Sequence, residues 1–307
     1  MKLVVGTRGS KLSIIQTQEV INSLKERYRE MEFEIKIIKT TGDIDLETPL
    51  YRIQKKGIFE KEIDLALINR EIDFAVHSLK DYPTDTLEGI RIVAVPKRLS
   101  PYDALTSRIG SDLIDLPRKS KVGTSSLRRE AFIKYLRKDL EVIPIRGNLD
   151  TRLKKMFNGV VDAIVVAEAG LIRLGERVDF KRLNIDDFTP PAGQGALAVI
   201  ARVDDDRLIE ILSTINDEKS WMETSIERRI ISLLKVGCKT PIGVCARVEK
   251  GGVDVTVSTV SLDYEKKVLV NEFIEGEDME KISSKIVESF KREGGEEIIR
   301  EWRSYYD

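Results

Sequence analysis

The sequence has very few of the residues from which many functional sites are built. Its 307 residues include one histidine, His77, and two cysteines, Cys238 and Cys245. Two cysteines exclude a disulfide-rich scaffold, their spacing matches no common metal motif, and one histidine argues against a multi-histidine metal site. No apolar run approaches the ~18 residues that span a bilayer. The length favours about two domains with a core large enough to fold without disulfides or metal.

An excess of one charge is also missing. The chain has 51 Lys and Arg against 52 Asp and Glu, a net charge of -1. This balance argues against a nucleic-acid-binding protein that relies on positive charge. The N-terminal MKLVVGTRGSKL is interrupted by Gly, Arg and Lys, so it does not match a signal peptide. We therefore expect a cytoplasmic protein without nucleic-acid or membrane partners.

Strand and helix patterns alternate through the first two thirds of the chain. This order indicates an α/β fold with mainly parallel sheets. The opening Val5-Gly6-Thr7 recurs as Val122-Gly123-Thr124, each time before a serine and a basic helix start, which predicts two internally similar lobes. The predicted strands are 2–5, 33–39, 73–78, 141–145, 163–167 and 197–202, and the predicted helices are 11–28, 59–69, 126–136 and one after Asn148.

Two segments rich in turn-forming residues, 95–101 and 189–195, bracket the second lobe. If both cross between lobes, strand 197–202 rejoins the first sheet and a hinged cleft forms at the carboxyl ends of the strands. Beyond residue 219, a helix, three strands with a hairpin turn at Gly251-Gly252 and a last helix over 279–292 predict a small antiparallel α+β domain. The expected domains are 1–96 with 196–215, then 97–195, then 216–307.

The segment after strand 73–78 offers the first candidate site. Lys80 and Asp81 come at the carboxyl edge of the sheet, just before Pro83. A carboxylate there can stabilise a developing cation or transfer protons. A surface Lys–Asp ion pair is the alternative. His77 is predicted to be a packed residue, because no second histidine or Ser–Asp arrangement supports a hydrolase triad.

Arginines gather at the ends of other predicted elements. The segment 123–126 starts a helix whose free backbone N–H groups favour anions, and Arg128 and Arg129 follow it. Segment 7–10 repeats this chemistry in the first lobe, with an ordinary capped helix as the alternative in each case. Three more arginines follow the next strands: Arg146, Arg152 and Arg173. Together these positions predict a ligand with several carboxylates.

The two cysteines have different surroundings. Cys238 lies in a loop bounded by Gly and Pro, residues 236–243, and the neighbouring Lys239 favours a thiolate. A reactive thiol and an inert loop residue are equally open for Cys238. Cys245 is predicted to be a small buried strand residue.

Nine segments, in order along nearly the whole chain, resemble the hydroxymethylbilane synthase family, also called porphobilinogen deaminases. Any one would be weak, but nine in order are specific. They are GTRGSKLSIIQTQ (6–18), KTTGD (39–43), KKGIFEKE (55–62), AVHSLKDYP (75–83), VGTSSLRRE (122–130), IRGNLDTRL (145–153), AEAGLIRLG (167–175), PPAGQGAL (190–197) and VGCKTPIG (236–243).

The resemblance implies two hinged lobes similar to type II periplasmic binding proteins, plus a small C-terminal α+β domain. It implies a transferase that adds porphobilinogen units, each with loss of ammonia, to a dipyrromethane cofactor. The product, hydroxymethylbilane, is then released by hydrolysis. The cofactor attachment, a thioether, falls on Cys238. A monomer with porphobilinogen as its small-molecule substrate is expected.

The same resemblance assigns roles to individual residues. Asp81 matches the catalytic carboxylate, which stabilises the cation left by departing ammonia. Tyr82 departs from the pattern, because a small apolar residue usually precedes this proline, and residues 43–57 fall near a mobile lid of the family. The cofactor-binding residues are Cys238, Lys80, Asp81, Thr124, Ser125, Ser126, Arg128, Arg129, Arg146 and Gly147. The substrate-binding residues are Arg8, Ser10, Gln16, Arg146, Arg152, Arg173 and Gln194.

Two other functions fit parts of the pattern. A non-catalytic two-lobe binding protein for a polycarboxylate accounts for the lobes and the arginines but not for the Cys238 loop. A Schiff-base enzyme would use Lys80 as its nucleophile, and borohydride with substrate would trap it.

Overall fold

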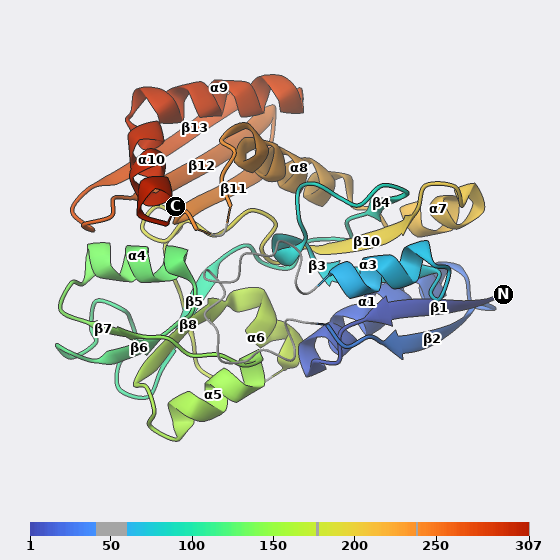
Figure 1. Ribbon diagram of the computed structural model, residues 1–307, viewed down its shortest axis with the longest axis horizontal. Coiled ribbons are helices and arrows are strands. Elements are labelled where there is room, and N and C mark those ends of the chain that lie inside the picture. Colours follow the sequence, from blue (N-terminus) through green and yellow to red (C-terminus); the bar gives the residue numbers. More distant parts are fainter. Residues whose placement is uncertain (41–59, 176–177, 238, 307) are drawn as a thin grey trace.

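The computed structural model describes residues 1–40, 60–175, 178–237 and 239–306. These residues form three sheets with helices packed against them (Figure 1). The two five-stranded sheets belong to the two predicted lobes, and the third sheet lies with the C-terminal helices. The predicted mixed α/β class is confirmed.

The first sheet has the strand order β2-β1-β3-β10-β4. β1 runs parallel to β2 and β3, whereas β10 runs antiparallel to both β3 and β4. Four of the five strands therefore share one direction, as the prediction of a mainly parallel sheet requires. Only β10 opposes them, because the chain returns from the second lobe in the opposite direction and enters the sheet between β3 and β4. The elements are β1 (Lys2–Thr7), α1 (Lys11–Arg27), β2 (Glu32–Ile37), α3 (Lys61–Ile68), β3 (Phe74–Ser78), β4 (Ile90–Ala94), β10 (Leu197–Arg202) and α7 (Asp206–Ser213).

The second sheet repeats the first. Its order, β7-β6-β8-β5-β9, has the same two parallel and two antiparallel pairs in the same sequence. The predicted internal similarity is confirmed, and the repeated openings end β1 and β6 at equivalent places. The elements are β5 (Asp103–Ser107), β6 (Lys121–Gly123), α4 (Leu127–Leu136), β7 (Glu141–Ile143), α5 (Leu149–Phe157), β8 (Ala163–Ala167), α6 (Glu168–Leu174) and β9 (Lys181–Arg182).

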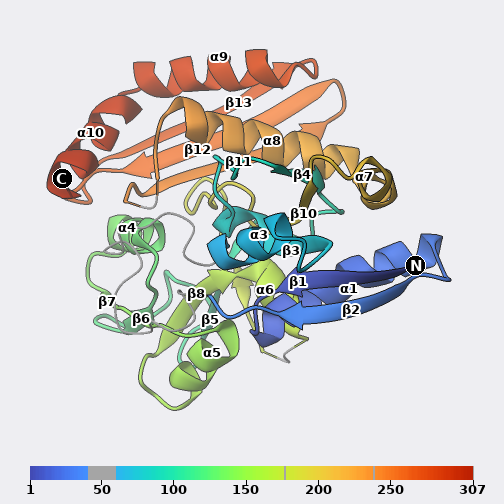
Figure 2. The ribbon, with the colours of Figure 1, turned by 45° about the vertical axis from the view of Figure 1, so that its right-hand side comes forward.

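The third sheet is antiparallel, in the order β11-β12-β13, and α8 and α9 pack against it (Figures 1 and 2). The predicted α+β character is confirmed. The expectation that helix 279–292 is the last one is wrong, because Gly294, with φ +89°, ends it and a further helix follows. That helix buries Ile298, Ile299 and Trp302 in the same core. The elements are α8 (Glu218–Leu233), β11 (Ile242–Glu249), β12 (Gly252–Val260), β13 (Lys267–Glu275), α9 (Met279–Arg292) and α10 (Gly295–Tyr306).

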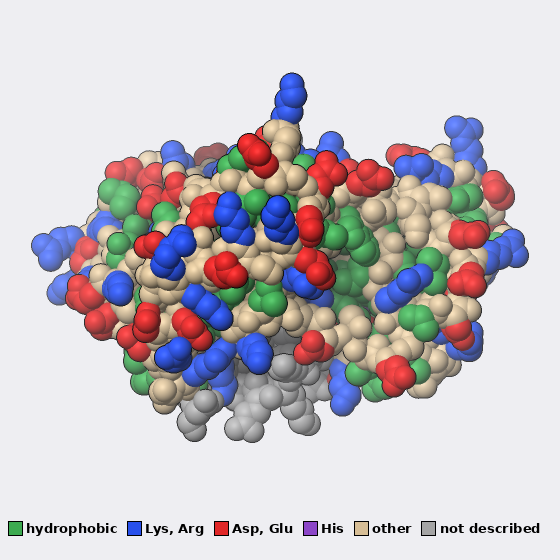
Figure 3. Space-filling view, turned by 90° about the horizontal axis from the view of Figure 1, so that it is seen from above, with side chains coloured by type: hydrophobic (Ala, Val, Ile, Leu, Met, Phe, Trp, Pro, Cys, Tyr) green, Lys and Arg blue, Asp and Glu red, His purple; other side chains and the backbone are tan. Residues whose placement is uncertain are grey.

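In the described ranges, none of the helices has the length and apolar character that crossing a membrane requires. Seen from above the third sheet, Lys and Arg side chains are interspersed with Asp and Glu (Figure 3). On this face, neither sign of charge forms a patch of its own.

The three sheets are joined around Arg98, in the first connection between the lobes. Its guanidinium donates to both carboxylate oxygens of Glu227 on α8, at 2.8 and 3.2 Å, and its Nε donates to the Gln194 carbonyl at 2.8 Å. Glu227 also accepts the N–H groups of Gly193 (2.6 Å) and Ala246 (2.9 Å). The Arg98 and Glu227 side chains are 4% and 0% exposed. One buried ion pair thus ties both connections to the C-terminal elements.

Breaking this pair is expected to destabilise the whole chain. Glu227→Ala leaves the Arg98 guanidinium and two N–H groups buried without their acceptor, at a cost of ~3–5 kcal/mol. Asp204→Ala is the matched control, because its ion pair with Arg70 is 58% and 62% exposed and is worth less than ~1 kcal/mol. Urea unfolding curves measure both. Equal midpoints for the two variants would contradict a dominant role for the Arg98–Glu227 pair.

Candidate active site

The predicted catalytic segment forms a single helical turn at the carboxyl end of β3. The strand ends at Ser78, and Leu79–Asp81 makes a 3-10 turn whose Leu79 is buried. The Leu79 N–H donates to the Ala196 carbonyl at 3.0 Å. Gln16 and Ser78 exchange side-chain hydrogen bonds of 2.9 and 3.1 Å, so Gln16 supports the start of the turn. Lys80 is left half-buried and Asp81 exposed.

Arg128 and Arg129 meet a carboxylate that sequence reasoning missed. Asp103 is fully buried at the start of β5, and it accepts Arg128 Nη2 at 2.5 Å and Arg129 Nη2 at 2.7 Å. Burial raises the pKa of Asp103, but the two guanidinium groups outweigh this effect and hold it at about 2. Arg128 Nη1 also donates to the Thr189 carbonyl at 2.6 Å. Both arginines are therefore fixed by the protein itself.

Gln194 links this cluster to the first lobe. Its side chain is fully buried, and its Nε2 donates to Asp103 Oδ1 at 3.1 Å and to the Pro101 carbonyl at 2.9 Å. Its Oε1 accepts Lys80 Nζ at 3.3 Å and Arg129 Nη2 at 3.4 Å. The side-chain amide of Gln194, in the connection 189–195, thus contacts one cation from each lobe.

The pKa values of Lys80 and Arg152 are shifted by some of the same charged neighbours. Burial lowers the pKa of Lys80 to about 8, with Asp81 opposing the shift and Arg129 adding to it. Burial also lowers the pKa of Arg152 to about 10, with Arg129 and Arg146 adding to the shift and Asp81 opposing it. Shifts of this kind indicate cations crowded together in poorly hydrated surroundings. Arg152 Nε additionally donates to the Gly147 carbonyl at 2.8 Å.

The hydroxyl groups of the two repeated loops have local partners. Ser10 caps α1 by accepting the Ser13 N–H at 3.1 Å, and Ser126 caps α4 by accepting the Arg129 N–H at 3.4 Å. Thr124 Oγ1 accepts the Ser126 N–H at 3.2 Å. Ser125 Oγ donates to the Ile145 carbonyl at 2.5 Å. The capped-helix interpretation thus holds for both loops, next to the cationic cluster in the second.

Arg173 and Arg8 lie on other elements of the two lobes. Arg173 pairs across the lobes with Glu19 of α1, at 2.8 Å from Nε to Oε2. Arg8 is half-buried between β1 and α1. Cys238 and the segment 43–57 lie outside the described residues. Next to Cys238, Lys239 Nζ donates to the Tyr306 carbonyl at 3.3 Å.

A local signal could have found Asp103. It is a lone acid at the start of the apolar strand 103–107, shortly after Pro101, and an acid in a buried strand needs a cationic partner. Its partners lie 25 and 26 residues away, so the sequence alone does not identify them.

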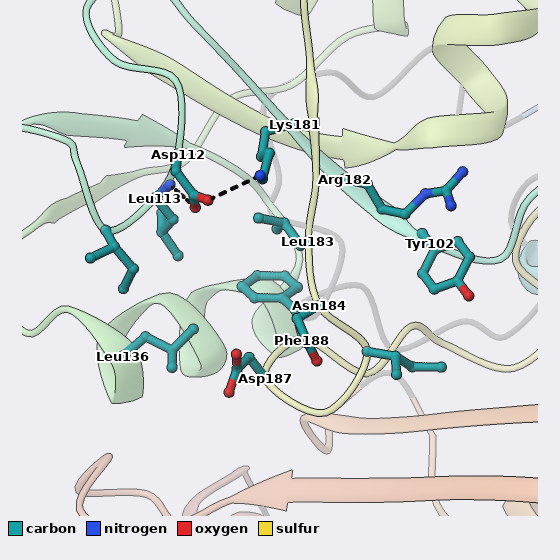
Figure 4. A pocket seen from close by; sticks show the side chains of 12 residues that line it. Tyr102, Asp112, Leu113, Leu136, Lys181, Arg182, Leu183, Asn184, Asp187 and Phe188 are labelled. Atoms are coloured by element: carbon teal, nitrogen blue, oxygen red, sulfur yellow. Dashed lines mark hydrogen bonds and ion pairs between the residues drawn. The ribbon is translucent and has the colours of Figure 1, made fainter.

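A cavity of about 520 Å³ lies elsewhere on the second lobe, between the end of α4 and the segment 181–188 (Figure 4). Phe188 projects into it, and Lys181 and Asp112 face one another at 3.8 Å. The residues that line it include none of the predicted site residues. The cavity is therefore separate from the cationic cluster.

The cluster's chemistry fits an anionic group with several carboxylates. Its cations outnumber its carboxylates, which are those of Asp81 and Asp103. A dipyrromethane with acidic side chains has the complementary charge. The cations are Lys80, Arg128, Arg129, Arg146 and Arg152.

Comparisons with known proteins also indicate a dipyrromethane-binding protein. The family model described as porphobilinogen deaminase, dipyromethane cofactor binding domain, matches residues 3–210. A probable porphobilinogen deaminase of Nitrosopumilus maritimus is 41% identical over 303 residues, covering 99% of this chain and 97% of that protein. One of Methanothermobacter thermautotrophicus is 43% identical, covering 94% and 100%. A porphobilinogen deaminase of Desulforudis audaxviator is 42% identical, covering 99% and 98%.

Among solved structures, a TRAP periplasmic solute binding protein of Desulfovibrio salexigens is similar at 11% identity, with a TM-score of 0.42. It covers 72% of this chain and 73% of its own. A likeness this distant adds nothing to the assignment, which rests on the family model and the relatives. Matches of their extent show that the chain belongs to the porphobilinogen deaminase family, the hydroxymethylbilane synthases, and is a transferase of tetrapyrrole biosynthesis that uses a dipyrromethane cofactor.

Proposed function

We propose that Asp81 is the catalytic carboxylate for assembling hydroxymethylbilane from porphobilinogen, on a dipyrromethane held by Cys238. The observation that carries this proposal is that Lys80, next to Asp81, is joined through Gln194 to Arg129 and Asp103 of the second lobe. Family membership favours this reaction over a non-catalytic polycarboxylate-binding protein.

The cationic residues bind and orient the acidic side chains of cofactor and substrate. Lys80 and Arg152 have already lost much of their hydration in the folded chain, so a carboxylate that reaches them meets strong attraction. Arg128, Arg129, Arg146 and Gly147, with the hydroxyls of residues 124–126, are assigned to the cofactor. The substrate side is assigned to Arg8, Ser10, Gln16, Arg146, Arg152, Arg173 and Gln194.

Asp81 acts where charge develops. When the aminomethyl C–N bond of porphobilinogen breaks, both bonding electrons leave with nitrogen as ammonia, and the substrate becomes a cation. The Asp81 carboxylate stabilises that cation and can move the protons that the departing nitrogen gains and the joined ring carbon loses. When bound, the cofactor supplies the pyrrole carbon to which the first unit is joined.

The assignment of Cys238 as attachment point gains support from the other cysteine. Cys245 on β11 is fully buried. Burial, and then Glu227, raises the pKa of its thiol, which makes it a poor nucleophile. Only two cysteines are present in the sequence.

The chain organisation belongs to the same proposal. We infer three domains, residues 1–96 with 196–215, residues 97–195 and residues 216–307. The return of β10 to the first sheet and the repeat of that sheet's topology in the second support these bounds. A cytoplasmic monomer with porphobilinogen as substrate and no nucleic-acid or membrane partner completes the proposal.

The cofactor attachment is tested by denaturing mass spectrometry. The wild type and Cys245→Ala are expected to carry the mass of two linked pyrrole units, and Cys238→Ala is expected to lack it. Cys245→Ala is the matched control, because it removes the buried thiol alone. A wild type that stays unmodified after incubation with porphobilinogen would contradict the proposal.

Asp81→Asn tests the catalytic carboxylate. The variant keeps the fold and the cofactor mass, because Asp81 is exposed, but loses the charge that stabilises the cation. Turnover of porphobilinogen is expected to fall by about 100- to 10,000-fold. Glu88→Gln, an exposed acid seven residues on, is expected to leave turnover unchanged. Near-normal turnover in Asp81→Asn would remove this residue from the mechanism.

The lowered pKa of Lys80 predicts a pH effect. Above about pH 8 this ammonium loses its proton in the folded chain, so kcat/KM for porphobilinogen should fall along a limb near pH 8. Lys80→Arg keeps the charge and should move that limb to higher pH. The free energy of unfolding should change with pH in the opposite direction to kcat/KM. Between about pH 8 and the usual lysine range, the unfolded chain binds more protons at Lys80 than the folded chain does. The contribution of Lys80 to the free energy of unfolding therefore increases as pH rises. An alkaline limb identical in both proteins would exclude Lys80 as its source.

A further inference from the structure

Three buried polar side chains outside the proposed catalytic and binding set lie beside the turn that carries Asp81. His77 is on β3, Tyr82 directly follows Asp81, and Asp64 belongs to α3. They are only 6%, 3% and 3% exposed. Their neighbours are apolar, since Tyr82 belongs to a core cluster with Ile63, Leu79 and other side chains. Polar groups in such surroundings are normally fully partnered.

Each of the three contacts the other two. The Tyr82 hydroxyl donates to Asp64 Oδ2 at 3.2 Å, and His77 Nε2 lies 3.6 Å from Asp64 Oδ1. The rings of His77 and Tyr82 lie 5.1 Å apart between centroids, with planes 33° apart. Burial, and then Asp64, raises the pKa of Tyr82, so its hydroxyl keeps the proton it donates.

The cluster is incompletely satisfied. Among the described residues, His77 Nε2 and Asp64 Oδ1 have no hydrogen-bond partner, and the 3.6 Å between them is a few tenths of an ångström too long for one. Unpaired buried groups of this kind cost about 1–3 kcal/mol each. Stability of the core alone therefore does not account for the cluster.

The position of the cluster beside the Leu79–Asp81 turn does account for it. The Leu79 N–H ties the start of the turn to the Ala196 carbonyl, just before β10. Arg228 of α8 donates to the carbonyls of Tyr82 (2.8 Å) and Pro83 (2.6 Å). The Tyr82 side chain adds a tie to α3 immediately after Asp81. The residue next to the catalytic carboxylate is thus held through both its backbone and its side chain.

We propose that Tyr82, Asp64 and His77 are positioning residues that fix the Leu79–Asp81 turn and, through it, the carboxylate of Asp81. The inference rests on the proposed function, because it gives the cluster a role in that reaction. A displacement of about 1 Å at a catalytic group lowers turnover by up to ~100-fold. Lys80 belongs to the same turn, but the arginines that are assigned to binding lie on other elements, so KM is expected to change less than kcat.

Tyr82→Phe is the test, because it removes the hydroxyl and keeps the ring. The holoenzyme should show kcat for porphobilinogen reduced about 10- to 100-fold, with KM within twofold of the wild type. His77 is the only histidine, so its imidazole gives one set of signals in ¹H–¹⁵N NMR spectra, and these should shift. Tyr28→Phe makes the same change in the same lobe and should alter neither quantity.

Wild-type kcat in Tyr82→Phe overturns the proposal, whether or not the His77 signals move. A reduced kcat with unmoved signals also overturns it, because the hydroxyl would then act without the cluster. If Tyr82→Phe does not fold, Asp64→Asn takes its place with the same expectations and the same contradicting results. Failure of the proposed function is distinguishable, since the wild type would not convert porphobilinogen while the His77 shift still appeared.

Discussion

The candidate site depends on the buried carboxylate of Asp103. Without it, two adjacent guanidinium groups would be desolvated side by side, which is unfavourable for both. With it, Arg128 and Arg129 are held at 2.5 and 2.7 Å, and Gln194 is placed to accept from Lys80. One carboxylate from the second lobe therefore organises cations of both lobes before any ligand arrives, which is the arrangement that preorganised electrostatic sites require.

The resulting field has two opposite effects on the proposed reaction. Crowded cations attract the carboxylates of cofactor and substrate, as the lowered pKa values of Lys80 and Arg152 indicate. The same cations oppose the positive charge that develops when ammonia leaves. In the proposed reaction, the carboxylates of cofactor and substrate would neutralise the arginines, and Asp81 would supply negative charge at the carboxyl end of β3. Binding and catalysis thus require both signs of charge within one cluster.

Local patterns predicted most of the fold, and non-local contacts account for what they missed. Sequence patterns located β8, β10 and α9 at their observed bounds, because β8 and β10 are continuous apolar runs buried on both faces and α9 buries one regular apolar face. They did not reveal that β10 enters antiparallel, since strand direction depends on how the chain returns from the second lobe. The helix α10 was missed although Ile298, Ile299 and Trp302 have helical spacing, because Gly294-Gly295 reads as the end of an element.

The site shows the same division. The motifs placed Lys80, Asp81, Arg128 and Arg129 at element ends, and the structure links Lys80, Arg129 and Arg128 through Gln194 and Asp103. Nothing local identified Asp103 as the partner of the arginines, or Glu19, which lies 154 residues from Arg173. A motif specifies which residue stands at a position, whereas its partner is chosen by topology.

Two ion pairs between different parts of the fold, Arg98–Glu227 and Glu19–Arg173, differ in burial. This difference affects how a hinged cleft between the lobes could open. Arg98 and Glu227 are almost fully buried and hold both connections between the lobes, so the connections are the costly place to move. In the Glu19–Arg173 pair, which bridges α1 and α6, Arg173 is 5% exposed but Glu19 is 39% exposed. Water therefore reaches this pair from one side, and breaking it costs less than breaking the Arg98–Glu227 pair. A separation of the lobes that kept the Arg98–Glu227 contacts would therefore break the Glu19–Arg173 pair. It would release an arginine to which the family resemblance assigns substrate binding.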